Sequence, residues 1–73
     1  MQASALAIIT LRRETAARYE RVNRLWLMAC TAYRRLNEAP VQNLRALREA
    51  AARLDQLSRG RAALRRDLKA LAD

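Results

Sequence analysis

Residues 47–71 read LREAAARLDQLSRGRAALRRDLKAL and decide the fold. Their seam positions recur at alternating intervals of three and four residues, the spacing of a helix face that packs against another helix. The seam consists of Leu47, Ala50, Leu54, Leu57, Arg61, Leu64, Leu68 and Leu71. Gly60 lies inside this segment, but the heptad phase continues through it without a slip. We therefore predict one helix over about residues 41–72, weakened by about 1 kcal/mol at Gly60.

The first half of the chain carries a matching seam and a second apolar stripe beside it, which together predict a helix over about residues 4–37. The seam consists of Ile8, Leu11, Thr15, Arg18, Val22, Leu25, Ala29, Ala32 and Leu36. The stripe consists of Ile9, Ala16, Tyr19, Trp26, Cys30 and Tyr33. The combined face is wider than pairing with one helix requires, and this width is typical of a helix in a bundle.

A turn is predicted between the two helices at residues 37–40, which read NEAP. Pro40 is disfavoured inside a helix and restrains Ala39, while Asn37 suits a C-cap position. Two helices of similar length joined by a short turn favour an antiparallel arrangement. The predicted fold is thus all-α, a two-helix hairpin that forms a single domain over residues 1–73.

Folding about residue 39 pairs positions whose numbers sum to about 78. This register places Arg18 level with Arg61. Two seam arginines at one level should repel each other unless an acidic group or an anion lies between them, so Arg18 and Arg61 form a candidate anion-binding pair.

Length and composition indicate that the hairpin needs a partner. A chain of 73 residues has room for only a small core. Its one cysteine cannot form an internal disulfide, and without histidine it lacks the ligands of the usual zinc or iron sites. Residues 25–30 read LWLMAC, an apolar run that covers every side of a helix. We expect no cofactor and no metal, and we expect a homodimer that forms a four-helix bundle.

Several functional classes are disfavoured by the sequence. No Gly-rich phosphate loop, nucleophile elbow or Cys–His pair is present, so we expect no enzymatic activity and no small-molecule substrate. Residues 1–11 lack the basic start and cleavage-like site of a secretory signal, and no uncharged run reaches the ~20 residues of a membrane span. We expect a cytoplasmic protein without a membrane partner. Its many alanines and arginines suggest a GC-rich bacterial or phage genome.

An apolar patch rimmed by arginine is the main functional candidate. Leu27 and Met28 belong to neither the seam nor the stripe of the first helix, so we expect them to be exposed. Trp, Met and Arg are favoured at protein interfaces. The candidate protein-binding residues are Leu27, Met28, Trp26, Arg21, Arg24, Arg34 and Arg35. They predict a small interaction module that binds a larger host protein with an acidic surface and modulates it, most simply by inhibition. Its size and composition suit a phage or mobile-element protein.

Two other functions stay open. The net charge of +8 favours contact with nucleic-acid phosphates whatever the base sequence. The candidate nucleic-acid-binding residues are Arg45, Arg48, Arg59, Arg66 and Lys69. Alternatively, the chain is a structural subunit of a larger assembly.

Overall fold

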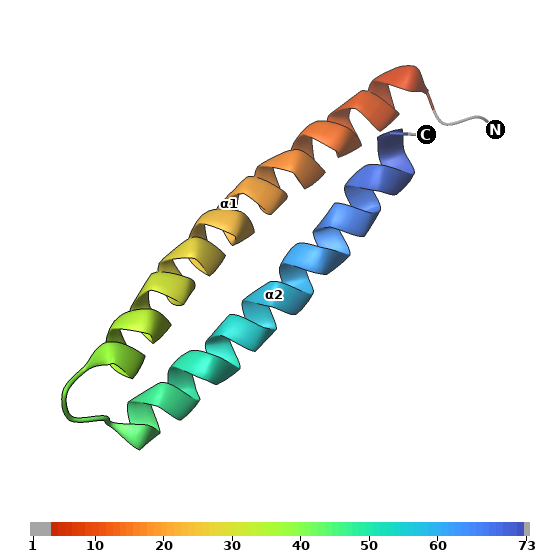
Figure 1. Ribbon diagram of the computed structural model, residues 1–73. Coiled ribbons are helices and arrows are strands. Elements are labelled where there is room, and N and C mark those ends of the chain that lie inside the picture. Colours follow the sequence, from red (N-terminus) through yellow and green to blue (C-terminus); the bar gives the residue numbers. More distant parts are fainter. Residues whose placement is uncertain (1–3, 73) are drawn as a thin grey trace.

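The computed structural model describes residues 4–72 as two long helices, α1 (Ala5–Glu38) and α2 (Leu44–Ala72). They run antiparallel and form a rod of about 60 × 15 × 15 Å (Figure 1). This architecture confirms the predicted all-α helical hairpin. The outer limits of the predicted domain, residues 1 and 73, lie outside the described residues.

The ends of α1 follow from local hydrogen bonding and from Pro40. Ser4 caps the helix, since its Oγ accepts a hydrogen bond from the Ala7 N–H at 3.1 Å. At the other end Ala39 is extended, with φ −62° and ψ 141°, because the proline that follows it disfavours the helical conformation. The helix therefore ends at Glu38 with Ala39 as its C-cap, and the prediction of a cap at Asn37 was wrong by two residues.

The connection is longer than predicted because α2 begins at Leu44 rather than near residue 41. Asn43 caps α2: its Oδ1 accepts from the Ala46 N–H at 3.0 Å, and its carbonyl accepts from the Leu47 N–H at 2.9 Å. The Gln42 side chain donates back to the Asn37 carbonyl at 3.1 Å and closes the turn.

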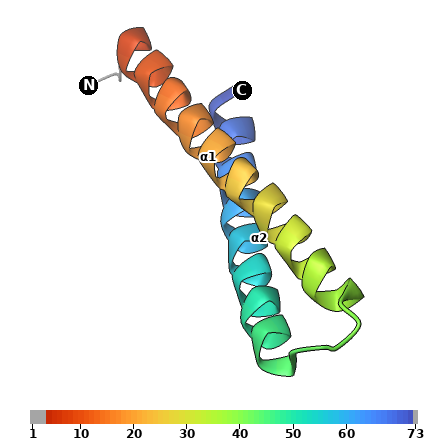
Figure 2. The ribbon, with the colours of Figure 1, turned by 90° about the vertical axis from the view of Figure 1, so that its left-hand side faces the viewer.

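The longer connection shifts the register between the helices. Asn23 contacts Arg61, and Trp26 contacts Ser58, so the paired residue numbers sum to 84 rather than about 78. The predicted encounter of Arg18 with Arg61 is consequently not observed. One further contact, from the Arg12 Nε to the Leu71 carbonyl, places residue 12 level with the end of α2. The first two turns of α1 therefore project beyond α2 (Figure 2).

The predicted seam of α2 is confirmed. Each of its eight residues, from Leu47 to Leu71, is shielded in part by α1, and α2 remains one helix through Gly60. Apart from the neighbouring turns of α2 itself, no atom of residues 4–72 lies within 4 Å of the position that a Cβ on Gly60 would occupy. This glycine is therefore an ordinary helical residue that loosens α2 without bending it.

The contact face of α1 is rotated from the predicted seam toward the aromatic stripe. Tyr19, Trp26 and Tyr33 are shielded by the hairpin, whereas the seam residues Leu25 and Ala32 are exposed. Large aromatic side chains bury more area than alanine when they face a neighbouring helix, which favours this rotation. The rotation thereby leaves the seam residues Leu25 and Ala32 uncovered by α2.

The hairpin has no complete apolar core of its own. Among residues 4–72, no hydrophobic residue is buried, and the one buried residue is Thr15. The Thr15 hydroxyl donates a hydrogen bond to the Leu11 carbonyl at 2.8 Å. Two helices cover only one face of each other, so the remaining apolar faces stay exposed to solvent. Neither α1 nor α2, within the part described, is apolar over a length sufficient to cross a bilayer.

Candidate partner-binding surface

Three adjoining depressions on the hairpin share one side chain, Met28. They have volumes of about 360, 240 and 260 Å³. Their apolar lining is formed by Leu25, Leu27, Met28, Ala29, Ala32 and Ala50. We call these residues, with the arginines described below, the Met28 surface. Met28 is 68% exposed, Leu27 51% and Leu25 42%, so this surface is open to a partner.

Helical spacing explains why these residues lie together. Leu25, Met28, Ala29 and Ala32 follow one another at intervals of three, one and three residues, which places them on a single side of α1. The helix turns its aromatic side toward α2, so this aliphatic side is not covered. Ala29 and Ala50 are small and line a shared hollow at the edge of the helix pair.

Arginines from both helices rim the Met28 surface. Arg21, Arg24 and Arg35 come from α1, and Arg53 comes from α2. Among residues 4–72, no carboxylate lines any of the three depressions. An apolar centre with a cationic border suits a protein partner that offers apolar side chains within an acidic surface.

The sequence identified part of this surface and missed five of its members, which are Leu25, Ala29, Ala32, Ala50 and Arg53. Leu27 lines one of the three depressions, whereas Leu25 lines two. Leu25 and Ala32 had been assigned to the seam, and Arg53 belongs to the other helix. The spacing of Leu25, Met28 and Ala32 was the available signal, but only the rotation of α1 shows that their side is exposed.

Two predicted members lie elsewhere. Arg34 is exposed and lines none of the three depressions. Trp26 is shielded in part at the contact with α2, where its Nε1 donates to the Ser58 Oγ at 2.8 Å. The guanidinium of Arg61 lies over the indole at 4.4 Å from the ring centroid, so Trp26 supports the helix pair and stands apart from the Met28 surface.

The candidate anion pair is separated in the structure. Arg18 lines a depression with Thr15, Asp67 and Leu71, near the open end of the hairpin. Arg61 instead donates through Nε to the Asn23 Oδ1 at 2.7 Å. The two arginines share no depression, so the structure does not bring them together as one site.

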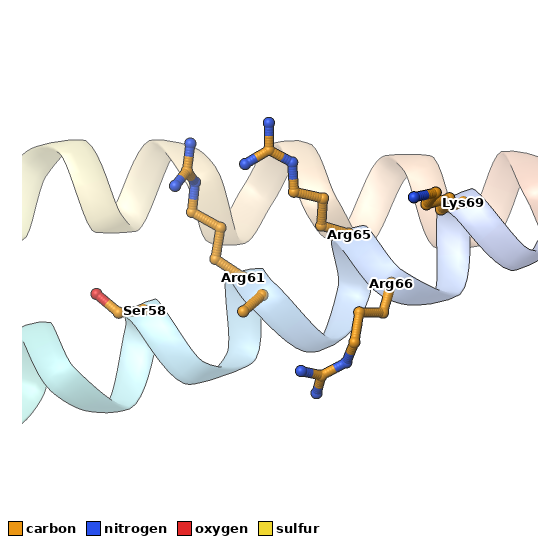
Figure 3. Close-up of a pocket in the computed structure, with 6 residues that line it drawn as sticks. Ser58, Arg61, Arg65, Arg66 and Lys69 are labelled. Carbon is orange, nitrogen blue, oxygen red and sulfur yellow. The ribbon is translucent and has the colours of Figure 1, made fainter.

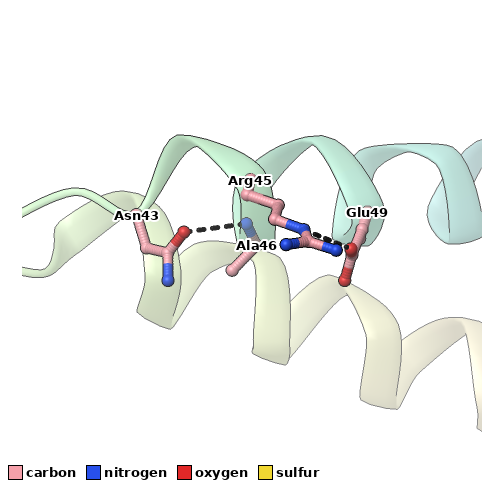
Figure 4. Close-up of polar contacts among 4 residues, drawn as sticks. All are labelled: Asn43, Arg45, Ala46 and Glu49. Atoms are coloured by element: carbon pink, nitrogen blue, oxygen red, sulfur yellow. Dashed lines mark hydrogen bonds and ion pairs between the residues drawn. The ribbon is translucent and has the colours of Figure 1, made fainter.

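The candidate nucleic-acid residues fall into two groups. Arg66 and Lys69 line a groove on α2 with Arg61 and Arg65, of which Arg65 was missed by the sequence analysis (Figure 3). Arg45 instead pairs with Glu49 at 3.4 Å (Figure 4), and Arg59 pairs with Asp55 at 3.1 Å. Arg48 is exposed. Both ion pairs are exposed helix-surface contacts of small energetic weight.

Comparisons with family models, curated proteins and solved structures gave no match for this chain. Within residues 4–72, no three His, Cys, Asp or Glu side chains gather in a way that could hold a metal ion.

Proposed function

We propose that this chain is a non-enzymatic interaction module that binds a larger protein through the Met28 surface. The supporting observation is that three connected depressions converge on an exposed methionine and have four arginines at their border. Methionine adapts to irregular partner surfaces, and arginine combines apolar contact with bidentate pairing to carboxylates. The partner would offer one or two apolar side chains surrounded by aspartate and glutamate.

Such binding would modulate the partner by occlusion. The rod carries its binding surface along one side, so a docked hairpin would cover an extended strip of the partner. Inhibition is the simplest consequence if that strip includes a site used by the partner.

Self-association is part of the proposal. Because the described chain has no fully buried hydrophobic side chain, a single hairpin leaves apolar area in water on both helices. A second hairpin would cover part of it as a four-helix homodimer. The exposed apolar residues of the projecting end, Leu6, Ile8, Ile9 and Leu11, are available for this contact.

The test compares two charge-matched double variants in affinity capture followed by titration against the identified partner. Leu25→Asp with Met28→Asp changes the Met28 surface. Val41→Asp with Leu44→Asp changes apolar residues that are also exposed, at 86% and 63%, but lie near the turn. We expect the first variant to lose at least about 30-fold in affinity, as for a central interface anchor, and the second to bind normally.

Three results would count against the proposal. Equal losses in both variants would place the contact elsewhere. Capture that disappears after nuclease treatment would favour a nucleic-acid ligand, and filaments or rings formed without a partner would favour a structural subunit. Circular dichroism of each variant shows whether the helices remain formed.

A further inference from the structure

The side chains of one segment of α2 form a groove with a strongly basic lining. Its volume is about 520 Å³, and its lining residues are Ser58, Arg61, Ala62, Arg65, Arg66 and Lys69. Ser58, Ala62, Arg65 and Lys69 follow one another at intervals of four, three and four residues, so they form one row along the helix. Arg61 and Arg66 flank this row (Figure 3). We call this the basic groove.

The cations of the basic groove are not neutralised by the described part of the chain. Across residues 4–72, the ion pairs are Arg45–Glu49 and Arg59–Asp55, and neither includes a lining residue of the groove. The acidic residue nearest in sequence, Asp67, lines a different depression beside Arg18. Arg65, Arg66 and Lys69 thus face solvent beside the partly buried Arg61, and this gathering of four positive charges costs repulsion and attracts a polyanion.

One guanidinium in the groove is held in place before any ligand binds. Arg61 donates through Nε to the Asn23 Oδ1 at 2.7 Å, and it stacks over Trp26 at 4.4 Å. These contacts fix the plane of the guanidinium and leave its two terminal nitrogens as donors. A prealigned guanidinium loses less conformational freedom when it binds a phosphate.

The spacing of the charges fits a nucleic-acid backbone. Arg61 and Lys69 are eight residues apart, or about 12 Å along the helix axis. One strand of a duplex presents a phosphate about every 3.4 Å of axis, so this length faces three to four phosphates. Within residues 4–72, no apolar side chain larger than that of Ala62 lines the groove, whereas a helix that lies on a membrane needs large apolar anchors.

We infer that the basic groove is a binding site for the phosphate backbone of nucleic acid, recognised without regard to base sequence. It shares no lining residue with the Met28 surface. The hairpin can therefore hold a protein and a nucleic acid at the same time. This inference is independent of the proposed protein partner.

The test measures the affinity for a labelled 20-base-pair duplex of mixed sequence by fluorescence anisotropy, at salt concentrations between 50 and 200 mM. Over this range the release of counterions from the phosphates makes the affinity fall as salt rises. We expect the wild-type affinity to fall about 40- to 150-fold across this range, the effect of three to four phosphate contacts. Arg65→Gln, Arg66→Gln and Lys69→Gln together should reduce that change to about 4-fold. Arg65→Gln alone should lower the slope of log affinity against log salt by about 0.9.

The matched control removes the same number of charges outside the groove, by Arg12→Gln, Arg13→Gln and Arg34→Gln, and should retain the wild-type salt dependence. Equal losses in both triple variants would overturn the inference, since binding would then reflect net charge alone. Failure of the wild type to bind the duplex would also overturn it, as would binding only to vesicles that contain phosphatidylserine. The substituted residues are exposed, and circular dichroism verifies that both triple variants remain helical.

Discussion

The contact between Asn23 and Arg61 provides the sharpest test of the helix pairing. Arg61 occupies a seam position that apolar residues fill elsewhere in α2, and its Nε donates to the Asn23 Oδ1 at 2.7 Å in a partly buried setting. A hydrogen bond to a charged group contributes roughly 1.5–3 kcal/mol, and partial exposure favours the lower end. Asn23→Ala should therefore lower the free energy of unfolding by about 1.5 kcal/mol.

Arg61→Ala should cost more, because it also removes the stacking of the guanidinium over Trp26 at 4.4 Å. A cation–π contact of this exposure adds about 0.5–1 kcal/mol, which gives a total loss of about 2–2.5 kcal/mol. Once Arg61 is absent, Asn23→Ala should have little further effect. The double variant should consequently match Arg61→Ala, with a coupling energy of about 1.5 kcal/mol.

Urea unfolding followed by far-UV circular dichroism, at one fixed protein concentration, measures these values for the wild type and the three variants. The matched control cycle pairs Asn23→Ala with Arg59→Ala, since Arg59 is exposed and its ion pair is with Asp55. That cycle should show no coupling. A coupling below about 0.5 kcal/mol between Asn23 and Arg61 would refute the register derived from their contact.

Gly60→Ala should raise the free energy of unfolding by about 1 kcal/mol, and Ala52→Gly, at an exposed position of the same helix, should lower it by a similar amount. Thermal unfolding compares the two, and a lower midpoint for Gly60→Ala would contradict a continuous α2. Asn43→Ala should cost about 1 kcal/mol because the Ala46 N–H loses its acceptor, whereas Asn43→Asp should be neutral in urea unfolding; equal stability of both variants would argue against the cap. Sedimentation equilibrium of the wild type should show dimerisation that increases with concentration, and a monomer at every concentration would contradict the proposed self-association.

The two candidate sites differ in how far the sequence could reveal them. Arg66 and Lys69 were recognised as basic surface residues, and Arg65 shares their exposed side of α2, whereas Arg61 was predicted on the seam and only its contacts with Asn23 and Trp26 show where its guanidinium lies. For the Met28 surface, the sequence supplied Met28, Leu27 and three arginines. It assigned Leu25 to the helix contact because either the seam or the aromatic stripe of α1 could have faced α2.

The sequence by itself determined that the chain forms two helices, that Pro40 separates them and that the seam from Leu47 to Leu71 faces inward without a break at Gly60. These properties are local, since helical periodicity fixes which residues share a side of one helix. Only the tertiary structure decided the offset between the helices, which depends on where Asn43 caps α2, and the rotation of α1, which depends on how its aromatic side chains pack. Those two quantities place Arg61 against Asn23 and Trp26 and leave Met28 exposed, because the packing between two helices is not encoded in the period of either one.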